Sequence, residues 1–338
     1  MKKLLSVLLA ALMVFALVGC GSKTEEAAGP KTVKVGVSIY KFDDTFMTNY
    51  RNEIAAYFET LNTDEVTYQV DIMDGKNDMA EQTNQIDNFI TQGYDVLILN
   101  LVQSSAAQTI VDKVAEAGIP TVFINREPAA EVMSSHADDF AGKFCYVGAD
   151  ARQSGKMQGE IIADLADKGD LNGDGTLQYI MIVGDPENVD AQYRTEFSIS
   201  QYQEVTGMPV ECLHQEQGMW DRDKGHEIAA NALTQYGDKI EVIFANNDDM
   251  ADGALTAIKE AGRTVGTDIY LVGVDANDYA VADVLEGTFT GTVLNDAVGQ
   301  SHGAVDAAIK AANGEALETY YWVDYVKVTS ANAAEYVK

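Results

Sequence analysis

Basic residues are scarce in this sequence. Its 338 residues include 23 Lys and Arg against 53 Asp and Glu, which gives a formal net charge of −30. An acidic surface repels the phosphate backbone of nucleic acids and the headgroups of an anionic membrane. We therefore expect no nucleic acid partner and no unassisted binding to a lipid surface.

Cysteine and histidine are also rare, with 3 Cys and 4 His. The histidines are scattered without the spacing of a metal site, so we expect no histidine-based metal centre. Beyond Cys20 the only cysteines are Cys145 and Cys212. Export would permit a disulfide between them, but we favour two buried free thiols. Low-complexity segments and short-period repeats are absent from the sequence.

Only one long hydrophobic run occurs, at residues 4–18, between two lysines and Cys20. It is short for a membrane span, and no stop-transfer charges follow it, which is typical of a signal peptide. Residues 17–20, Leu-Val-Gly-Cys, form a lipobox. We predict a signal peptide at 1–19, a lipidated Cys20 that anchors the mature protein to the membrane outside the cytoplasm, and a flexible tether at 20–31.

From residue 33 onward, short apolar runs alternate with helical segments. The expected strands are 33–39, 66–73, 96–99, 121–124, 144–147, 179–183, 210–213, 240–245, 269–274 and 290–294. This alternation is typical of doubly wound parallel sheets. Ten strands exceed one ordinary sheet, and residues 128–142 interrupt the rhythm. The sequence therefore predicts two α/β lobes of similar size.

Polar and aromatic side chains follow the strands at their C-terminal ends, where open α/β sheets bind ligands. Asp, Asn and Arg side chains complement the hydroxyl groups of a sugar, and two aromatic rings could cover the apolar faces of a pyranose. The candidate sugar-binding residues are Asp44, Phe46, Asn100, Asn188, Asp190, Arg194, Trp220, Asn247, Asp275 and Asn295.

A calcium loop is predicted at residues 170–178, Asp-Leu-Asn-Gly-Asp-Gly-Thr-Leu-Gln. Its oxygen-bearing residues alternate, and glycine stands at the sharp turn, as in an EF-hand loop. The twelfth position is Met181 instead of Glu, and a strand follows instead of a helix. A distant carboxylate must then complete the shell, and Glu241, at the start of the strand 240–245, is our candidate.

Together these motifs resemble those of the periplasmic galactose/glucose-binding proteins, the sugar receptors of ABC importers, over residues 33–338. The most specific stretches are 40–47, 86–87, 99–102, the calcium loop, 245–248, 273–276 and 291–297. The resemblance implies that the candidate residues above contact a sugar, with Asn188 standing where the family has histidine. The implied ligands of a structural Ca²⁺ are Asp170, Asn172, Asp174, Thr176 through its main-chain oxygen, Gln178 and Glu241.

The resemblance further implies a type I binding-protein fold, two doubly wound lobes joined by a hinge. The expected N-terminal lobe comprises 32–128 and 296–325, and the expected C-terminal lobe comprises 129–295 and 326–338. The protein would be a non-enzymatic monomer that closes over D-galactose or D-glucose and delivers it to an ABC permease. Asp44 can accept from the C4 hydroxyl of either sugar, so the sequence does not separate them.

Several alternatives remain open at this point. The ligand could be another monosaccharide. The partner protein that recognises the receptor could be a chemoreceptor or a sensor kinase instead of a permease. A calcium-dependent glycosidase could use two carboxylates among Asp44, Asp190 and Asp275, although neighbouring amides and an arginine favour ionised carboxylates over a raised-pKa acid. A sugar-responsive repressor would need a DNA-binding motif and a basic patch, whereas this chain begins with a lipobox.

Overall fold

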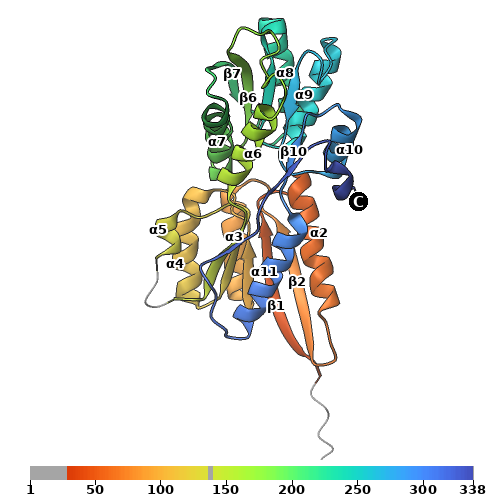
Figure 1. Cartoon of the computed structure of the whole chain (residues 1–338). Coiled ribbons are helices and arrows are strands. Elements are labelled where there is room, and N and C mark those ends of the chain that lie inside the picture. Colours follow the sequence, from red (N-terminus) through yellow and green to blue (C-terminus); the bar gives the residue numbers. More distant parts are fainter. Residues whose placement is uncertain (1–28, 136–139, 338) are drawn as a thin grey trace, which may run out of the picture.

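The computed structural model describes residues 29–135 and 140–337, which form two α/β lobes stacked end to end (Figure 1). The predicted signal peptide, Cys20 and most of the predicted tether lie outside the described residues. Within these two ranges, every helix is too short or too polar to cross a bilayer. The predicted fold class, two parallel-sheet lobes flanked by helices, is confirmed.

The N-terminal lobe is built on a six-stranded sheet in the order β11-β5-β4-β3-β1-β2, parallel throughout. Its strands are β1 Lys31–Ile39, β2 Val66–Asp74, β3 Val96–Leu99, β4 Thr121–Ile124, β5 Phe144–Gly148 and β11 Tyr320–Trp322. The inner strands β3, β4 and β5 are buried along their whole length. Their uninterrupted apolar sequence fits a sheet covered on both faces.

Helices cover both faces of this sheet. α2 Thr45–Thr60 and α11 Ala297–Ala312 pack together over one face, and their apolar sides share a core with β1, β3 and β4. α3 Met79–Thr91 and α4 Ala107–Ala117 cover the other face. The 3₁₀ turn η1 Ser104–Ala106 and the short α5 Ala130–Met133 complete this lobe.

The C-terminal lobe has a four-stranded parallel sheet in the order β7-β6-β8-β9 and an antiparallel pair, β10 with β12. Its strands are β6 Leu177–Val183, β7 Val210–Gln217, β8 Val242–Ala245, β9 Tyr270–Val272, β10 Thr292–Leu294 and β12 Val326–Val328. Its helices are α6 Ala151–Ala163, α7 Val189–Thr206, α8 Arg222–Tyr236, α9 Asp248–Glu260 and α10 Asp278–Glu286, with 3₁₀ turns η2 Gly237–Lys239 and η3 Ala333–Tyr336. α6 and α7 share one core, and α8, α9 and α10 share another.

The chain crosses between the lobes three times, after β5, after β10 and after β11 (Figure 1). The predicted first boundary at residue 128 is too early. β5 pairs with β4, as Thr121 with Phe144, and so belongs to the N-terminal sheet. The strands before and after this interruption, β4 and β5, belong to the same sheet, and the crossing comes after Gly148.

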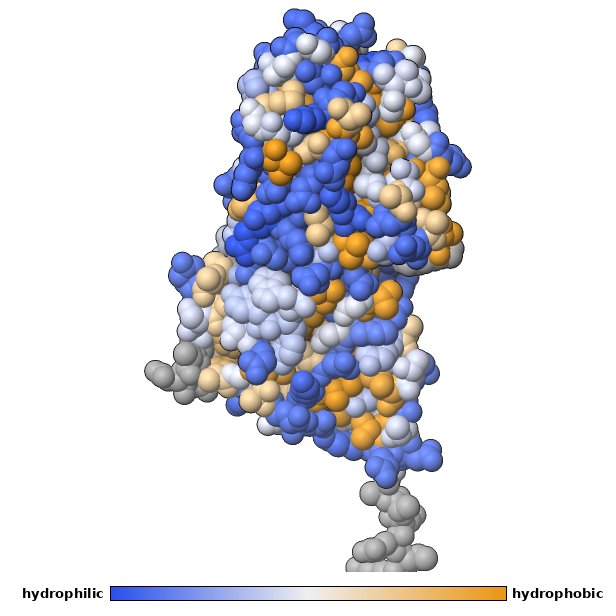
Figure 2. Space-filling model, viewed as in Figure 1, coloured by the Kyte–Doolittle hydropathy of each residue, from blue (hydrophilic) through white to orange (hydrophobic). Residues whose placement is uncertain are grey.

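Hydrophilic residues cover most of the face in Figure 2, as the excess of acidic residues leads one to expect. Both described cysteines are free, as predicted, and Cys145 is buried. The prediction of a second buried thiol is wrong, because Cys212 is exposed. It lies on β7, the edge strand of its sheet, where one side of the backbone and several side chains face solvent.

Candidate ligand cavity and metal loop

A cavity lies between the lobes, at the C-terminal ends of the strands of both sheets. The space between its side chains amounts to about 320 Å³, and this figure includes space that is open to solvent. Nine of the ten predicted sugar-binding residues line it. They are Asp44, Phe46, Asn188, Asp190, Arg194, Trp220, Asn247, Asp275 and Asn295.

Several of these residues also cap the helix that follows their strand. Asp44 accepts from the Met47 amide at 2.7 Å as the N-cap of α2. Asn188 and Asn247 cap α7 and α9 in the same way. A side-chain oxygen at an N-cap satisfies a free amide of the first turn. Capping therefore fixes these side chains at the helix starts, where they also face the cavity.

Arg194 is the central cation of the C-terminal wall. Its Nη1 donates to the Asn246 carbonyl at 2.7 Å and its Nη2 to the Tyr325 hydroxyl at 3.1 Å. The guanidinium lies 3.7 Å from Asp190 and 3.9 Å from Asp275. Its Nε has no hydrogen-bond partner among the described residues. One buried arginine thus serves two carboxylates, and one of its donor atoms is unpaired.

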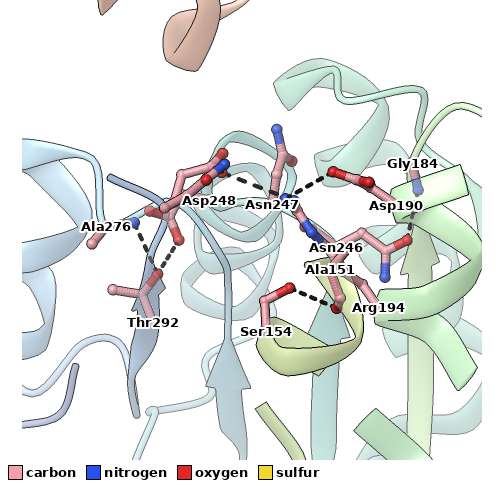
Figure 3. Close-up of polar contacts among 12 residues, drawn as sticks. Ala151, Ser154, Gly184, Asp190, Arg194, Asn246, Asn247, Asp248, Ala276 and Thr292 are labelled. Carbon is pink, nitrogen blue, oxygen red and sulfur yellow. Dashed lines mark hydrogen bonds and ion pairs between the residues drawn. The ribbon is translucent and has the colours of Figure 1, made fainter. Parts of the chain in front are cut away.

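A layer of hydrogen bonds behind this wall holds the strand ends in place (Figure 3). The Gly184 amide donates to Asn246 Oδ1 at 3.0 Å. The Thr292 hydroxyl donates to Asp248 Oδ1 at 2.6 Å and accepts from the Ala276 amide at 3.3 Å. These groups are buried, so each bond satisfies a polar atom that water does not reach. The loop that carries Asp275 is thereby tied to α9 and β10.

Three lining residues adopt left-handed backbone conformations. The φ angles are 60° at Asn125, 64° at Trp220 and 126° at Asp275. Such conformations cost a non-glycine residue about 1–3 kcal/mol and cluster at functional sites. The surrounding structure holds these strained positions, which marks them as candidates for a functional role.

Burial raises the pKa of Asp190 to about 6, although Arg194 and Arg126 act in the opposite direction. Burial also raises the pKa of Asp275 well above its usual range, again with Arg194 opposing. The expectation that Arg194 and the amides prevent a raised pKa is therefore wrong for Asp190 and Asp275. Desolvation outweighs the single shared guanidinium, and ligand hydroxyls that donate to the two carboxylates would favour the ionised forms.

The sequence analysis missed Arg126, the cation of the N-terminal wall. Arg126 is fully buried, and its Nη1 donates to the Val102 carbonyl at 2.6 Å and lies 3.0 Å from Asp185 in the other lobe. The guanidinium stacks on the Tyr40 ring at 3.9 Å. Its Nε and Nη2 have no hydrogen-bond partner in the described part of the chain. Arg126 therefore joins the two lobes and retains free donor atoms.

The signal for Arg126 was present in the sequence. Asn125 and Arg126 directly follow a predicted strand, just as the identified candidates follow theirs. Taking the polar residues after the C-terminal end of every predicted strand as candidates would have included both of them. The lining residues absent from the predicted set are Tyr40, Met47, Asn125 and Arg126.

Asn100 does not line the cavity. Its side chain accepts from the Tyr40 amide at 3.1 Å and donates to the Ile124 carbonyl at 3.2 Å and to Asn125 Oδ1 at 3.0 Å. It is completely buried behind Tyr40 and Asn125, which do line the cavity. Asn100 therefore positions two wall residues, and its predicted contact with a sugar stays a prediction.

The predicted metal loop meets Glu241, as expected from the missing twelfth ligand. Glu241 is buried just before β8, and β8 pairs with β6 next to the loop. Its Oε1 accepts from the Asn172 amide and its Oε2 from the Gln178 amide, both at 2.9 Å. The carboxylate thus reaches the loop across 63 residues of sequence.

The side chains of the loop converge on one another. Asn172 Nδ2 donates to Gln178 Oε1 at 2.8 Å, and Gln178 Nε2 donates to Asp174 Oδ2 at 2.9 Å. Asp170 accepts from the Gly175 amide at 2.9 Å. An all-oxygen donor set fits Ca²⁺. No group of three or more His, Cys, Asp or Glu side chains in the described chain is arranged to hold a metal ion, so amide and main-chain oxygens would have to contribute.

Comparison with known proteins agrees with this geometry. A protein of Rhizobium meliloti described as rhizopine-binding is 35% identical over 89% of this chain and 92% of its own length. The D-galactose/methyl-galactoside binding periplasmic protein of Haemophilus influenzae is 33% identical over 90% of this chain and 92% of its own length. The solved structure of an ABC transporter solute binding protein from Bacillus halodurans contains bound myo-inositol. It is 32% identical to this chain and covers 90% of this chain and 96% of its own, with a TM-score of 0.77.

The family model for the periplasmic binding protein domain matches residues 35–316, which include the four-stranded sheet, most of the N-terminal sheet, the first two crossings and all nine cavity residues that the sequence predicted. The fold, the position of the cavity and these similarities agree, and this chain belongs to the periplasmic binding protein family, type I.

Proposed function

We propose that this protein is an extracytoplasmic receptor that captures a six-membered polyhydroxylated ring, D-galactose or D-glucose, and delivers it to an ABC transporter. The observation that carries the proposal is the set of free donor atoms on Arg126 and Arg194, which belong to opposite lobes and line one cavity. Phe46 and Trp220 line the same cavity from the two lobes and could cover the ring faces.

The chemistry of the wall suits hydroxyl groups. A hydroxyl accepts from a guanidinium and at the same time donates to a carboxylate. The cavity offers both partners, with Arg126 and Arg194 as donors and Asp44, Asp190 and Asp275 as acceptors. A buried donor without a partner costs roughly 1–3 kcal/mol, so a ligand that satisfies these atoms gains affinity over one that does not.

A cyclitol such as myo-inositol is the second candidate. The solved neighbour from Bacillus halodurans carries bound myo-inositol and is 32% identical to this chain. A cyclitol has a hydroxyl on every ring carbon, where a hexose has one hydroxymethyl group and a ring oxygen. The free Nε and Nη2 of Arg126 supply donors for such an additional hydroxyl.

Calorimetry against D-galactose, D-glucose, myo-inositol, D-ribose and L-arabinose tests the proposal. We expect a hexose or myo-inositol to bind at least tenfold more tightly than either pentose, because a missing ring group leaves buried polar atoms unpaired. A pentose that binds most tightly would contradict the assignment. Turnover of an aryl galactoside by the purified protein would support the glycosidase alternative instead.

Ligand capture would proceed by closure of the lobes about the three crossings, a hinge motion common to two-lobed receptors. Side-chain contacts between the two lobes would hold the protein in a closed conformation. They include the Arg126–Asp185 ion pair at 3.0 Å and the bond from the Ser105 hydroxyl to Glu187 at 3.0 Å. The closed form would be what the permease recognises, with a chemoreceptor or sensor kinase as an alternative partner.

We also propose that Cys20 is lipidated and anchors the mature protein, because the sequence carries a lipobox at 17–20. The native protein is expected to fractionate with membranes, since two or more acyl chains hold a protein firmly on a bilayer. Cys20→Ser should leave the protein without lipid. Mass spectrometry that finds an unmodified Cys20 in the mature native protein would contradict this prediction.

A structural Ca²⁺ in the loop at 170–178 is a further part of the proposal. Asp170, Asn172, Asp174, Gln178 and Glu241 would hold the ion by side-chain oxygens, and Thr176 by its main-chain oxygen. The support is the convergence of loop side chains with a carboxylate from beside β8. A bound ion would cross-link two segments that are distant in sequence and would contribute to stability.

A further inference from the structure

Tyr325 is a buried residue behind the C-terminal wall of the ligand cavity. It belongs to the third crossing, residues 323–325, which joins β11 to β12. Its side chain is buried and does not line the cavity. A buried tyrosine hydroxyl usually has a hydrogen-bond partner, and here the partner is Arg194, which does line the cavity.

The Tyr325 hydroxyl is one of two acceptors that orient the Arg194 guanidinium. Arg194 Nη2 donates to this hydroxyl at 3.1 Å, and Nη1 donates to the Asn246 carbonyl at 2.7 Å. Asp190 lies 3.7 Å from Nη2 and Asp275 lies 3.9 Å from Nη1, beyond the usual range of about 2.7–3.2 Å for an N–H···O bond. The two carboxylates therefore attract the cation, while the hydroxyl and the carbonyl fix the direction of its plane.

The backbone that carries Tyr325 is bonded to the chain on both sides of the first crossing. The Tyr325 amide donates to Gln153 Oε1 at 2.8 Å, and the Val323 amide donates to the Gly148 carbonyl at 2.9 Å. Gly148 ends β5 just before the first crossing, and Gln153 lies in the first turn of α6 just after it. The hydroxyl that reaches Arg194 is thus attached to a firmly held segment.

We propose that Tyr325 is a positioning residue for ligand binding, whose hydroxyl holds the Arg194 guanidinium in the orientation that faces the ligand. This inference deepens the proposed function and rests on it. A guanidinium that loses one of its two acceptors can turn about its side-chain torsions. The ligand must then order it again, which reduces the net binding free energy.

Tyr325→Phe tests this role, because it removes the hydroxyl and keeps the ring. The probe is D-galactose, D-glucose or myo-inositol, whichever the wild type binds most tightly in calorimetry. We expect about tenfold weaker binding, since hydrogen bonds that involve a charged group are the stronger kind. An affinity within twofold of wild type would overturn the proposal.

Tyr321→Phe is the matched control. Tyr321 lies on β11, its hydroxyl accepts from the Glu318 amide at 3.0 Å, and it does not line the cavity. The substitution also removes one hydrogen-bonded hydroxyl close to the third crossing, but this hydroxyl does not contact Arg194. It should change the affinity less than twofold, and a loss equal to that of Tyr325→Phe would overturn the specific role of Tyr325.

A double-mutant cycle distinguishes positioning of Arg194 from packing. Arg194→Lys keeps the positive charge but lacks the Nη2 atom that donates to Tyr325. In this background Tyr325→Phe should change the affinity less than twofold, because the hydroxyl no longer has a guanidinium to orient. The same tenfold loss in both backgrounds would show that Tyr325 acts through packing alone and would overturn the proposal.

The pH dependence of binding provides a further readout. Burial raises the pKa of Asp190 to about 6, and Arg194 opposes this rise. A guanidinium that turns away opposes it less, so the pKa of Asp190 should be higher in Tyr325→Phe. The protonated form accepts fewer hydrogen bonds from a ligand, so the loss of affinity relative to wild type should be larger at pH 6 than at pH 8, by about threefold. An equal loss at both pH values would contradict the positioning role.

The other ionisable groups around Asp190 are the same in both proteins apart from Tyr325. They are Arg126, Asp150, Glu127 and Tyr146. Burial raises the pKa of Tyr325 to about 12, so its own hydroxyl stays neutral between pH 6 and pH 8. The comparison of the two proteins therefore reports on Asp190 and Arg194.

The proposed function and the role of Tyr325 fail in different ways. If none of the three rings binds to the wild type, the proposed function is wrong and the role of Tyr325 falls with it. If a ring binds to the wild type and Tyr325→Phe keeps the affinity within twofold, only the role of Tyr325 is wrong.

Discussion

Replacing Arg194 by alanine is expected to lower the affinity for the ring ligand by about thirtyfold to several thousandfold. Arg194 contacts Asp190, Asp275, Asn246 and Tyr325 within a buried wall. Truncating one partner of a buried, hydrogen-bonded charge pair at a binding site costs roughly 2–5 kcal/mol of binding free energy, at about 1.4 kcal/mol for each tenfold in affinity. Protonation of the two abandoned carboxylates would further reduce their ability to accept from ligand hydroxyls.

Arg222→Ala provides the control for this experiment. Arg222 also pairs with two aspartates of its lobe, Asp249 at 2.9 Å and Asp252 at 2.5 Å, but its side chain is 48% exposed and does not line the ligand cavity. Its removal should change the affinity less than twofold. Thermal melts of both variants would show that they are folded under the titration conditions. Affinity within tenfold of wild type in Arg194→Ala would contradict the assigned role.

Removal of calcium is expected to destabilise the protein without changing its ligand affinity. An ion bound only by the native state stabilises it by RT ln(1 + [L]/Kd), about 4 kcal/mol at a thousandfold excess over Kd. Chelation by EGTA should therefore lower Tm by several degrees, on the order of 5–10 °C. The loop at 170–178 does not line the ligand cavity, so the affinity measured well below Tm should stay nearly unchanged.

Glu241→Gln distinguishes the contribution of the proposed metal contact of this carboxylate from that of its hydrogen bonds to the loop. Glu241 accepts from two loop amides, so the variant should lose some stability even without metal. The informative quantity is the EGTA-induced change in Tm, which should be large in wild type and in Glu286→Gln, an exposed control on α10, and small in Glu241→Gln. If EGTA lowers Tm equally in all three proteins, Glu241 is not a metal ligand. If EGTA changes Tm in none of them, the loop is a turn that binds no metal.

Much of the cavity follows from one rule, that ligands bind where parallel strands end. The rule identified nine lining residues because each lies in the loop or at the helix start that follows a strand, and several are held there as helix caps. Glu241 was predicted to meet the loop at 170–178 for a different reason, because the predicted calcium loop lacks its last carboxylate. In both cases the local sequence carries the constraint.

Other features of the site depend on the tertiary arrangement, which one sequence does not specify. Asn100 and Asn125 follow the neighbouring strands β3 and β4, and only the order of these strands in the sheet places Asn125 between Asn100 and the cavity. The raised pKa of Asp190 depends on complete burial between lobes. The first crossing was misplaced because the interruption at 128–142 has the composition of a boundary, although the chain returns to the same sheet.

The three crossings also determine when each lobe can be completed during synthesis. The N-terminal sheet takes its edge strand β11 and its covering helix α11 from beyond residue 296, and Tyr320 pairs with Tyr146. Closing so long a loop is entropically costly, and such distant pairings slow folding. A nascent chain therefore lacks the α11 part of the cover on one face of this sheet until translation is nearly finished, although α2 is already present. The delay prolongs the unfolded state, the form that can be threaded through a narrow protein-conducting channel.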